Sequence, residues 1–406
     1  MSSLAPDGYA ARVEPGHAAP ASAPAEVRQE TAVSYGGPTP PPRRGRAGAV
    51  VAAIIGIAIA GGALLFVLVY LLTFLGTGTV LTAAILAFVP LGIVFLGARW
   101  IDRWEPEPRG ALLFAFLWGA GVSVLIALLV DSEIQNVLGA VDRDAPAVQL
   151  FQSAVQAPIV EEFGKGLGVL LILWFNRRHF DGPVDGIVYA AWVAGGFAFT
   201  ENIQYFGIAI AESQGSIAGV AGTFAVRGLM SPFAHVMFTA MTGLLLGVAA
   251  RRAGAFGAIG FFVLGLIPAV LLHALWNGAL FFVTDFYGYY AIVQVPLFIL
   301  AVVLVVALRR QEAALTYARL NEYAAAGWIA PGEVTALATP AGRRVALAWA
   351  RQRGAGRIMK RYIRDATRLA FARQRVITGR GRIGAQADEA RLLGAVTAAR
   401  RALMGG

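Results

Sequence analysis

Ionisable side chains lie in the middle of long apolar segments of this 406-residue chain. One segment contains Glu161 and Glu162 side by side, with Lys165 one helical turn after Glu161 and on the same helix face. A charged group at the centre of a membrane helix costs about 2.5–3.5 kcal/mol on insertion scales. Such a group needs a partner or a function, so these three residues are the first candidates for chemistry.

Three later apolar segments carry the other candidates. Glu201 and Asn202 lie together in the next segment, His235 lies near the start of the following one, and His273 and Asn277 share a helix face in the last. Two histidines and up to three carboxylates suit a divalent metal such as zinc, with one carboxylate free to take a proton from bound water. The same residues could instead activate water directly, by general base catalysis without metal.

A negative charge that develops on a substrate carbonyl oxygen needs hydrogen-bond donors nearby. Asn277, Asn202 and Lys165 are the candidates for this role. The chain has no cysteine, and no pattern typical of an activated serine is visible. Hydrolysis by activated water is therefore favoured over a covalent acyl-enzyme.

The elements that must position these residues are membrane helices. Apolar residues make up 57% of the chain and charged residues only 14%, compared with about 25% charged residues in an average soluble domain, which excludes an ordinary soluble enzyme. A spanning helix needs about 20 apolar residues. The sequence offers eight such runs: Val50–Leu75, Val80–Ala98, Ala111–Val130, Phe151–Phe175, Val184–Ile210, Met230–Ala250, Phe256–Val283 and Tyr289–Leu308. We therefore expect an all-α, polytopic membrane protein with about eight transmembrane helices.

The arginines predict the orientation of these helices. Several basic residues precede the first run and follow the second, fourth, sixth and eighth, whereas the other connections carry one at most. The positive-inside rule then places both termini in the cytoplasm. With a rise of about 1.5 Å per residue, Glu161, Glu201, His235 and His273 lie about 15, 14, 8 and 15 Å from the outer ends of their runs. Since neighbouring helices run in opposite directions, this shared depth predicts one buried polar cluster in the outer half of the membrane.

Composition divides the chain into three parts. Residues 1–46 are rich in Pro and Ala and are expected to form a disordered tail, and residues 47–308 form the membrane domain, with a catalytic core in 151–283. Residues 309–406 are expected to form a mostly helical cytoplasmic tail, and their nineteen basic and six acidic residues favour contact with anionic lipid. No base-reading motif for nucleic acid is visible. Glu105 and Glu107, between the second and third runs, are expected in a solvated loop.

Four features together resemble the PrsW family of intramembrane proteases, which is itself similar to the type II CAAX prenyl proteases and related bacterial membrane proteins. They are Glu-Glu-x-x-Lys at 161–165, Phe-x-x-x-Glu-Asn at 197–202, a histidine at 235 near the start of the next run, and His-x-x-x-Asn at 273–277. An acidic, Pro-rich stretch at 102–108 also resembles one common in that family. The resemblance covers about residues 99–308.

The resemblance implies an activity and a role for each candidate residue. The implied roles are Glu161 and Glu162 as the water-activating pair, Asn277 as support for the oxyanion, Glu201, His235 and His273 as metal ligands or water binders, and Lys165 and Asn202 as supporting residues. The implied task is cleavage of a single-span membrane protein, with anti-sigma factors as the known type of substrate, in the plasma (inner) membrane of a bacterium. Zinc or another divalent metal fits this set, and no organic cofactor is expected.

Other functions could use the same residues. A proton- or ion-coupled transporter is the main alternative, because intramembrane Glu and His side chains also carry protons. Against it, no repeat relates the first and second sets of four runs. A non-catalytic scaffold or a haem protein ligated by His235 and His273 is a third reading, although haem ligation needs no paired glutamates. The non-functional alternatives are a structural ion pair at Lys165 and hydrogen-bonded packing histidines.

Overall fold

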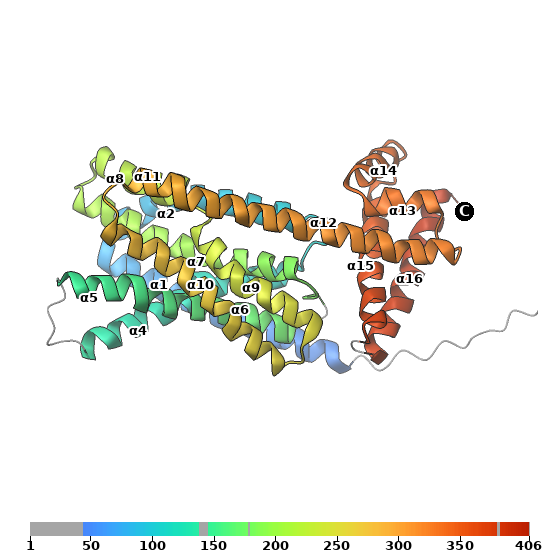
Figure 1. The fold of residues 1–406 in the computed structure, drawn as a ribbon, viewed down its shortest axis with the longest axis horizontal. Helices are drawn as coiled ribbons and strands as arrows, with labels where there is room; N and C mark the ends of the chain where they lie inside the picture. Colours follow the sequence, from blue (N-terminus) through green and yellow to red (C-terminus); the bar gives the residue numbers. More distant parts are fainter. Residues whose placement is uncertain (1–43, 138–144, 178, 380–381, 406) are drawn as a thin grey trace, which may run out of the picture. The chain divides into compact units, whose positions relative to one another are not determined.

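The computed structural model describes residues 44–137, 145–177, 179–379 and 382–405 (Figure 1). It is 88% helical and has no strand in these residues, which confirms the predicted all-α class. Residues 1–43, which make up nearly all of the predicted disordered tail, lie outside the described part of the chain.

Six helical segments of the described residues are long and apolar enough to cross a membrane. They are Val50–Leu75 within α1 (Arg44–Leu75), α2 (Thr77–Ile101), Arg109–Val137, Ile217–Arg252, α10 (Gly257–Phe282) and Phe286–Ala325. The other two predicted runs also form helices, α6 (Ala157–Phe175) and α7 (Pro183–Glu212), which carry the candidate charged residues. The number of eight spans stays a prediction.

Short π-helical segments interrupt several of these helices. Segment 109–137 consists of α3 (Arg109–Leu117), η1 (Trp118–Ser123) and α4 (Val124–Val137), and segment 217–252 consists of α8 (Ile217–Thr223), η3 (Phe224–Met230) and α9 (Ala234–Arg252). Segment 286–325 consists of α11 (Phe286–Tyr289), η4 (Tyr290–Gln294) and α12 (Val295–Ala325). Before α6, the chain forms α5 (Pro146–Phe151) and η2 (Gln152–Gln156). Single wide turns of this kind are rare and occur mostly at functional sites. Here η2 and η3 come just before the two helices that carry Glu161 and His235.

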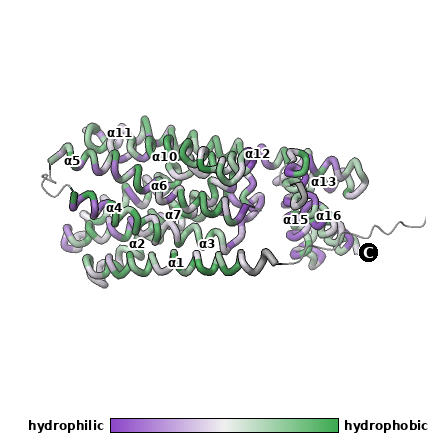
Figure 2. Tube along the Cα trace, turned by 90° about the horizontal axis from the view of Figure 1, so that it is seen from below, coloured by the Kyte–Doolittle hydropathy of each residue, from purple (hydrophilic) through white to green (hydrophobic). Residues whose placement is uncertain are grey.

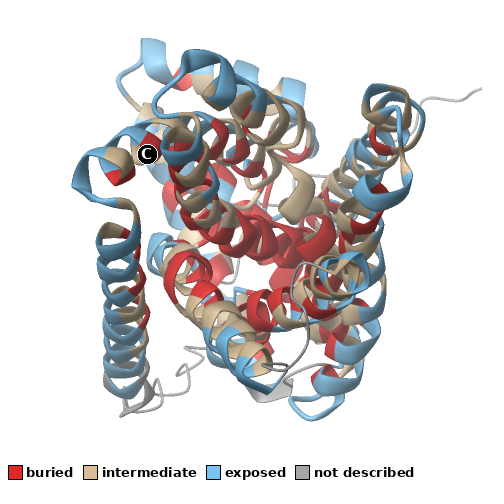
Figure 3. Ribbon diagram, turned by 90° about the vertical axis from the view of Figure 1, so that its left-hand side faces the viewer, coloured by how far each residue is buried: buried red, intermediate tan, exposed pale blue. Residues whose placement is uncertain are grey.

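The outer faces of the membrane helices are apolar, and the core lies around α7. Figure 2 shows hydrophobic residues along the length of α1, and Ile54, Leu65 and Phe74 of this helix are each more than 60% exposed. Such a surface suits lipid acyl chains, because a helix in the bilayer satisfies its backbone groups internally and gains nothing from polar side chains. Buried residues gather at the centre of the bundle, where α7 packs against α2, α3, η1, α6 and α9 (Figure 3).

Glycines allow α7 and α9 to cross closely. A Cβ atom added to Gly186 would lie 1.9 Å from the carbonyl oxygen of Gly243, and one added to Gly243 would lie 2.2 Å from the carbonyl oxygen of Gly186. Small residues at a crossing let two helix backbones approach each other. The crossing holds together α9, which carries His235, and α7, which carries Glu201.

Beyond the membrane helices, four further helices pack on the end of α12. They are α13 (Pro331–Ala338), α14 (Pro340–Gln352), α15 (Gly356–Ile377) and α16 (Arg382–Met404). Their shared core includes Leu320, Val334 and Leu369, none of which is exposed. Two of the helices begin at proline residues, a position where the missing N–H and fixed φ of proline are tolerated. The predicted domain boundary at residue 308 falls inside α12, which runs without a break to Ala325.

The expectation that Glu107 lies in a solvated loop is wrong. Only 7% of Glu107 is exposed, and its carboxylate accepts a 2.5 Å hydrogen bond from the Tyr189 hydroxyl of α7. Burial raises the pKa of Glu107 well above its ordinary value. The preceding Trp104 is also covered, because the guanidinium of Arg343 lies 3.4 Å from its ring centroid. The C-terminal helices therefore enclose the connection between α2 and α3.

We expect Gly186→Ala to lower the thermal unfolding midpoint of the purified chain in detergent by several degrees. The added methyl group cannot fit against the Gly243 carbonyl without moving α7 from α9, and overpacking of this kind costs about 1–3 kcal/mol. Gly92→Ala, at an exposed position of α2 with open space around the added Cβ, is the control. Equal midpoints for the two variants would show that the crossing does not limit stability.

Candidate active site

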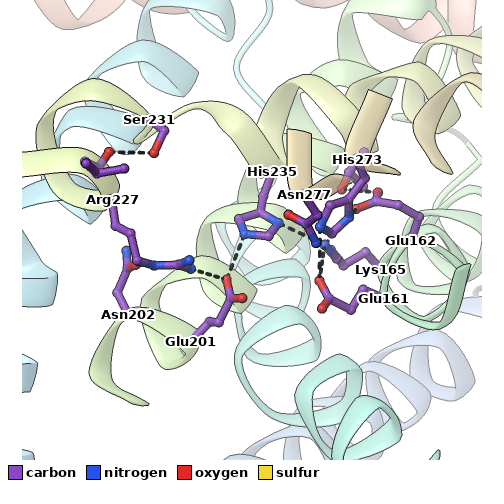
Figure 4. Close-up of polar contacts among 12 residues, drawn as sticks. Glu161, Glu162, Lys165, Glu201, Asn202, Arg227, Ser231, His235, His273 and Asn277 are labelled. Atoms are coloured by element: carbon purple, nitrogen blue, oxygen red, sulfur yellow. Dashed lines mark hydrogen bonds and ion pairs between the residues drawn. The ribbon is translucent and has the colours of Figure 1, made fainter. Parts of the chain in front are cut away.

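The structure brings the predicted site residues together from four helices (Figure 4). Glu161, Glu162 and Lys165 come from α6, Glu201 and Asn202 from α7, His235 from α9, and His273 and Asn277 from α10. Pro158, in the first turn of α6, starts the helix immediately after η2. Lys165 follows Glu161 by four residues and Glu162 by three, and both spacings place its side chain beside the glutamate on the surface of an α-helix.

Lys165 is the centre of the cluster. Its Nζ atom lies 2.7 Å from Glu162 Oε1, 3.2 Å from Glu161 Oε2 and 3.1 Å from His235 Nδ1, and its side chain is completely buried. The ammonium also lies 4.1 Å from the centroid of the Phe197 ring. The buried cation is therefore compensated by two carboxylates and an aromatic face.

Glu162 is enclosed and fully hydrogen-bonded. In addition to Lys165, Glu162 Oε1 lies 3.0 Å from His273 Nδ1, and Glu162 Oε2 accepts a 2.8 Å hydrogen bond from the Thr239 hydroxyl. Its side chain has no exposed surface, whereas 12% of the Glu161 side chain is exposed. The two adjacent glutamates thus differ in environment: Glu162 is fully enclosed and orients its neighbours, whereas Glu161 keeps a small exposed surface.

Each of the two histidines is held by a carboxylate through one ring nitrogen. His235 Nε2 lies 2.7 Å from Glu201 Oε2, and His273 Nδ1 lies 3.0 Å from Glu162. Because Lys165 can only donate, His235 Nδ1 accepts from it and His235 Nε2 carries the proton that Glu201 accepts. A carboxylate behind each imidazole is the usual arrangement around metal-binding histidines, where it fixes the tautomer and ring orientation.

Three of these residues could hold a metal ion. One ligand atom each from Glu161, His235 and His273 lies within 4.8 Å of the other two. A carboxylate and two imidazoles with room for water are the ligands of catalytic zinc sites. The ammonium of Lys165 touches two members of this group, so it has to move away when a cation binds among them. The donor set and its carboxylate supports therefore fit a divalent metal.

Glu201 lies outside this group of three, although the sequence predicted it as a ligand. Its Oε2 atom accepts a 2.7 Å hydrogen bond from Arg227, whose Nε donates to Asn202 Oδ1 at 3.0 Å. The guanidinium also stacks on Tyr205, 3.8 Å from the ring centroid. In the sequence, Arg227 is visible only as the single basic residue of the connection before the sixth run. The signal for its role was a lone arginine in an apolar stretch eight residues before His235.

Asn277 and a small cavity complete the surroundings of the site. Asn277 Nδ2 donates to the carbonyl oxygen of Ser153 in η2 at 2.9 Å, which leaves its second amide hydrogen for another acceptor. A cavity of about 20 Å³ lies beside His235 and is bordered by Asn202, Arg227 and Ser231. This volume is enough for about one water molecule.

The fold and this site are those of a polytopic membrane hydrolase. A family model of PrsW intramembrane metalloproteases matches residues 107–305. Protease PrsW of Bacillus subtilis is 30% identical over 198 residues, which cover 48% of this chain and 81% of that protein. Protease PrsW of Geobacillus kaustophilus is 34% identical over 165 residues (40% and 65% covered), and that of Clostridioides difficile is 29% identical over 194 residues (48% and 76% covered).

The chain belongs to the PrsW family of intramembrane metalloproteases. It is therefore a peptidase and a multi-pass protein of the bacterial inner membrane, as the sequence predicted, and the transporter reading is not favoured. No solved structure matches the chain.

Lys165→Met should destabilise the folded chain strongly. Without the ammonium, two adjacent carboxylates remain buried with no cation, and breaking a buried ion pair in this way costs about 3–5 kcal/mol. The chain has one other lysine, the exposed Lys360, so Lys360→Met is a matched control. Thermal unfolding in detergent would measure both, and a Lys165→Met midpoint equal to that of the control would contradict the central position of Lys165.

Proposed function

We propose that this protein is an intramembrane endopeptidase that cleaves a single-span, membrane-anchored protein of the anti-sigma-factor type. The observation that carries the proposal is the convergence of Glu161, His235 and His273 at one level of the helix bundle, with a carboxylate behind each histidine. The family membership supports proteolysis as the reaction, and the position of the site between apolar helices supports a substrate that reaches it through the membrane.

We infer that a divalent metal, zinc in the first instance, binds between Glu161, His235 and His273. The donor chemistry fits, and when bound the ion would polarise the scissile carbonyl and lower the pKa of bound water. Glu201 and Glu162 keep the two imidazoles in the required tautomers, which is a supporting role for Glu201 rather than the ligand role expected from the sequence.

Glu161 is the group proposed to take the proton from the hydrolytic water. Its carboxylate belongs to the group of possible ligands and contacts Lys165 through Oε2, while Oε1 has no hydrogen-bond partner among the described residues. A carboxylate at hydrogen-bond reach of water supplies general base catalysis. Asn277, which has one amide hydrogen left, and Lys165 are the proposed donors to the oxyanion that forms on the substrate carbonyl.

The partners proposed from the sequence fit this activity. The substrate is a single-span membrane protein, and the basic C-terminal helices contact anionic lipid at the cytoplasmic face. A role for nucleic acid has no support in the sequence.

Glu161→Gln should abolish the release of substrate fragments. The amide cannot accept a proton from water, and loss of a general base lowers the rate by about 10²–10⁴-fold. Membrane-protein terminal fragments would be compared in cells that carry the wild-type chain, Glu161→Gln or the control Glu133→Gln, which changes an exposed acid of α4. Fragments that persist with Glu161→Gln at wild-type levels would exclude Glu161 as the base, and fragments absent from the wild type under all conditions would count against proteolysis.

The metal is tested by elemental analysis of the purified chain. We expect about one zinc per chain, because three protein ligands and water complete a catalytic zinc site. His273→Ala should lose most of this metal, whereas His179→Ala, which changes an exposed histidine between α6 and α7, should keep it. Wild-type protein that cleaves its substrate with no bound metal would instead favour water activation by Glu161 and the histidines alone.

A further inference from the structure

A second, larger cavity lies away from the candidate active site. It has a volume of about 830 Å³ and lies between the α6–α7 and α9–α10 connections on one side and α12, α15 and α16 on the other. This volume falls in the range of small-molecule sites, which is about 300–1,000 Å³. None of the active-site residues borders it.

Arginines from three elements line this cavity. Arg177 follows α6, Arg251 and Arg252 end α9, and Arg375 lies near the end of α15. Three of them belong to the connections that the positive-inside rule places at the cytoplasmic face of the membrane. The cavity is therefore expected at the level of the cytoplasmic lipid headgroups.

Four arginines line the cavity against two acidic residues, and Arg251 also interacts electrostatically with the buried carboxylates of Asp181, Asp185 and Glu312. Asp181 pairs with Arg375 at 2.6 Å, and Asp388 pairs with Arg391 at 3.2 Å. Arg177 and Arg251 donate only to backbone carbonyls, those of Ala253 and Asp181. Together with Arg252 they form a group of three guanidinium ions with no carboxylate at ion-pair distance among the described residues.

The remaining walls are apolar. Phe180 and Phe371 are buried at the cavity, and Leu315 and Ala250 lie beside them. Guanidinium groups bind phosphate in paired hydrogen bonds, and apolar walls accept the hydrocarbon part of an amphiphile. This combination differs from a diffuse basic surface, because it has a fixed number of donors and a defined volume.

We propose that this cavity is a binding site for a phosphate group, carried by an anionic phospholipid or by a soluble phosphate compound. Its walls come from the membrane helices and from α15 and α16, so a bound phosphate adds contacts between them. Such a ligand stabilises the docking of the C-terminal helices by a free energy that grows with the logarithm of its concentration once that exceeds Kd. The proposal concerns binding alone and stands or falls independently of proteolysis.

The experiment measures binding to the full-length chain, purified and delipidated in a maltoside detergent. The probes are dihexanoyl phosphatidylglycerol, dihexanoylglycerol without a phosphate, and inorganic phosphate. Arg252→Gln removes one cavity guanidinium. Arg310→Gln removes the same charge from another exposed arginine at the cytoplasmic end of a membrane helix, outside the cavity, and is the matched control. Both side chains are exposed, so both variants should elute as the wild type does.

We expect a phosphate-bearing probe to bind saturably. Arg252→Gln should raise its dissociation constant about tenfold, which is the effect of losing one charge-assisted hydrogen bond. Arg310→Gln should leave the dissociation constant within twofold of the wild-type value. Saturable binding of the phosphatidylglycerol identifies a lipid source, and binding of inorganic phosphate without the lipid identifies a soluble one. The proposal is overturned if neither probe saturates, if dihexanoylglycerol binds as well as the phospholipid, or if the two variants weaken binding equally.

Discussion

The ammonium of Lys165 is the interaction around which the membrane core is arranged. An isolated ammonium in an apolar interior is strongly unfavourable, and two adjacent carboxylates without a cation are as well. Glu161, Glu162 and His235 surround this cation. Glu162 also contacts His273 and accepts a hydrogen bond from Thr239, so the position of Glu162 fixes these two side chains as well. One buried charge thus ties α6 to α9 and α10. The glycine crossing of α7 and α9 then fixes the fourth helix relative to these three.

His235 links this group to a second ion pair. One of its nitrogens faces Lys165 and the other faces Glu201, which Arg227 neutralises. Each of the three carboxylates therefore has a cation at ion-pair distance, Lys165 for Glu161 and Glu162 and Arg227 for Glu201. Glu161 lies near both histidines, and its Oε1 atom has no hydrogen-bond partner among the described residues. This difference separates Glu161, the proposed reactive acid, from Glu162 and Glu201, which orient the histidines.

Much of this arrangement could be predicted from the sequence, for two physical reasons. The length of an apolar run predicts where a membrane helix lies. Because charge in a membrane is costly, Glu161, Lys165 and His273 are recognisable as candidates without knowledge of their orientation. The distances from the run ends also predicted that Glu161, Glu201, His235 and His273 form one layer. Arg227 could not be found this way, because it lies in η3, whose wide turns bring it back over Glu201. Glu107 was misplaced because its partner is distant in sequence: Tyr189, 82 positions later in α7, binds its carboxylate. Arg343 of the C-terminal helices likewise covers Trp104 in the same connection.

A hydrolase between apolar helices must also receive water, and the same residues meet this requirement. The cavity beside His235 has room for about one water molecule, and polar groups of Asn202, Arg227 and Ser231 border it. Water in a dry environment needs two to four polar partners, and an apolar cavity of this size would stay empty. Because Arg227 both borders the cavity and pairs with Glu201, the residue that neutralises the carboxylate behind His235 also provides the polar wall that water needs. One side chain of η3 therefore borders this cavity and also pairs with the carboxylate that orients His235.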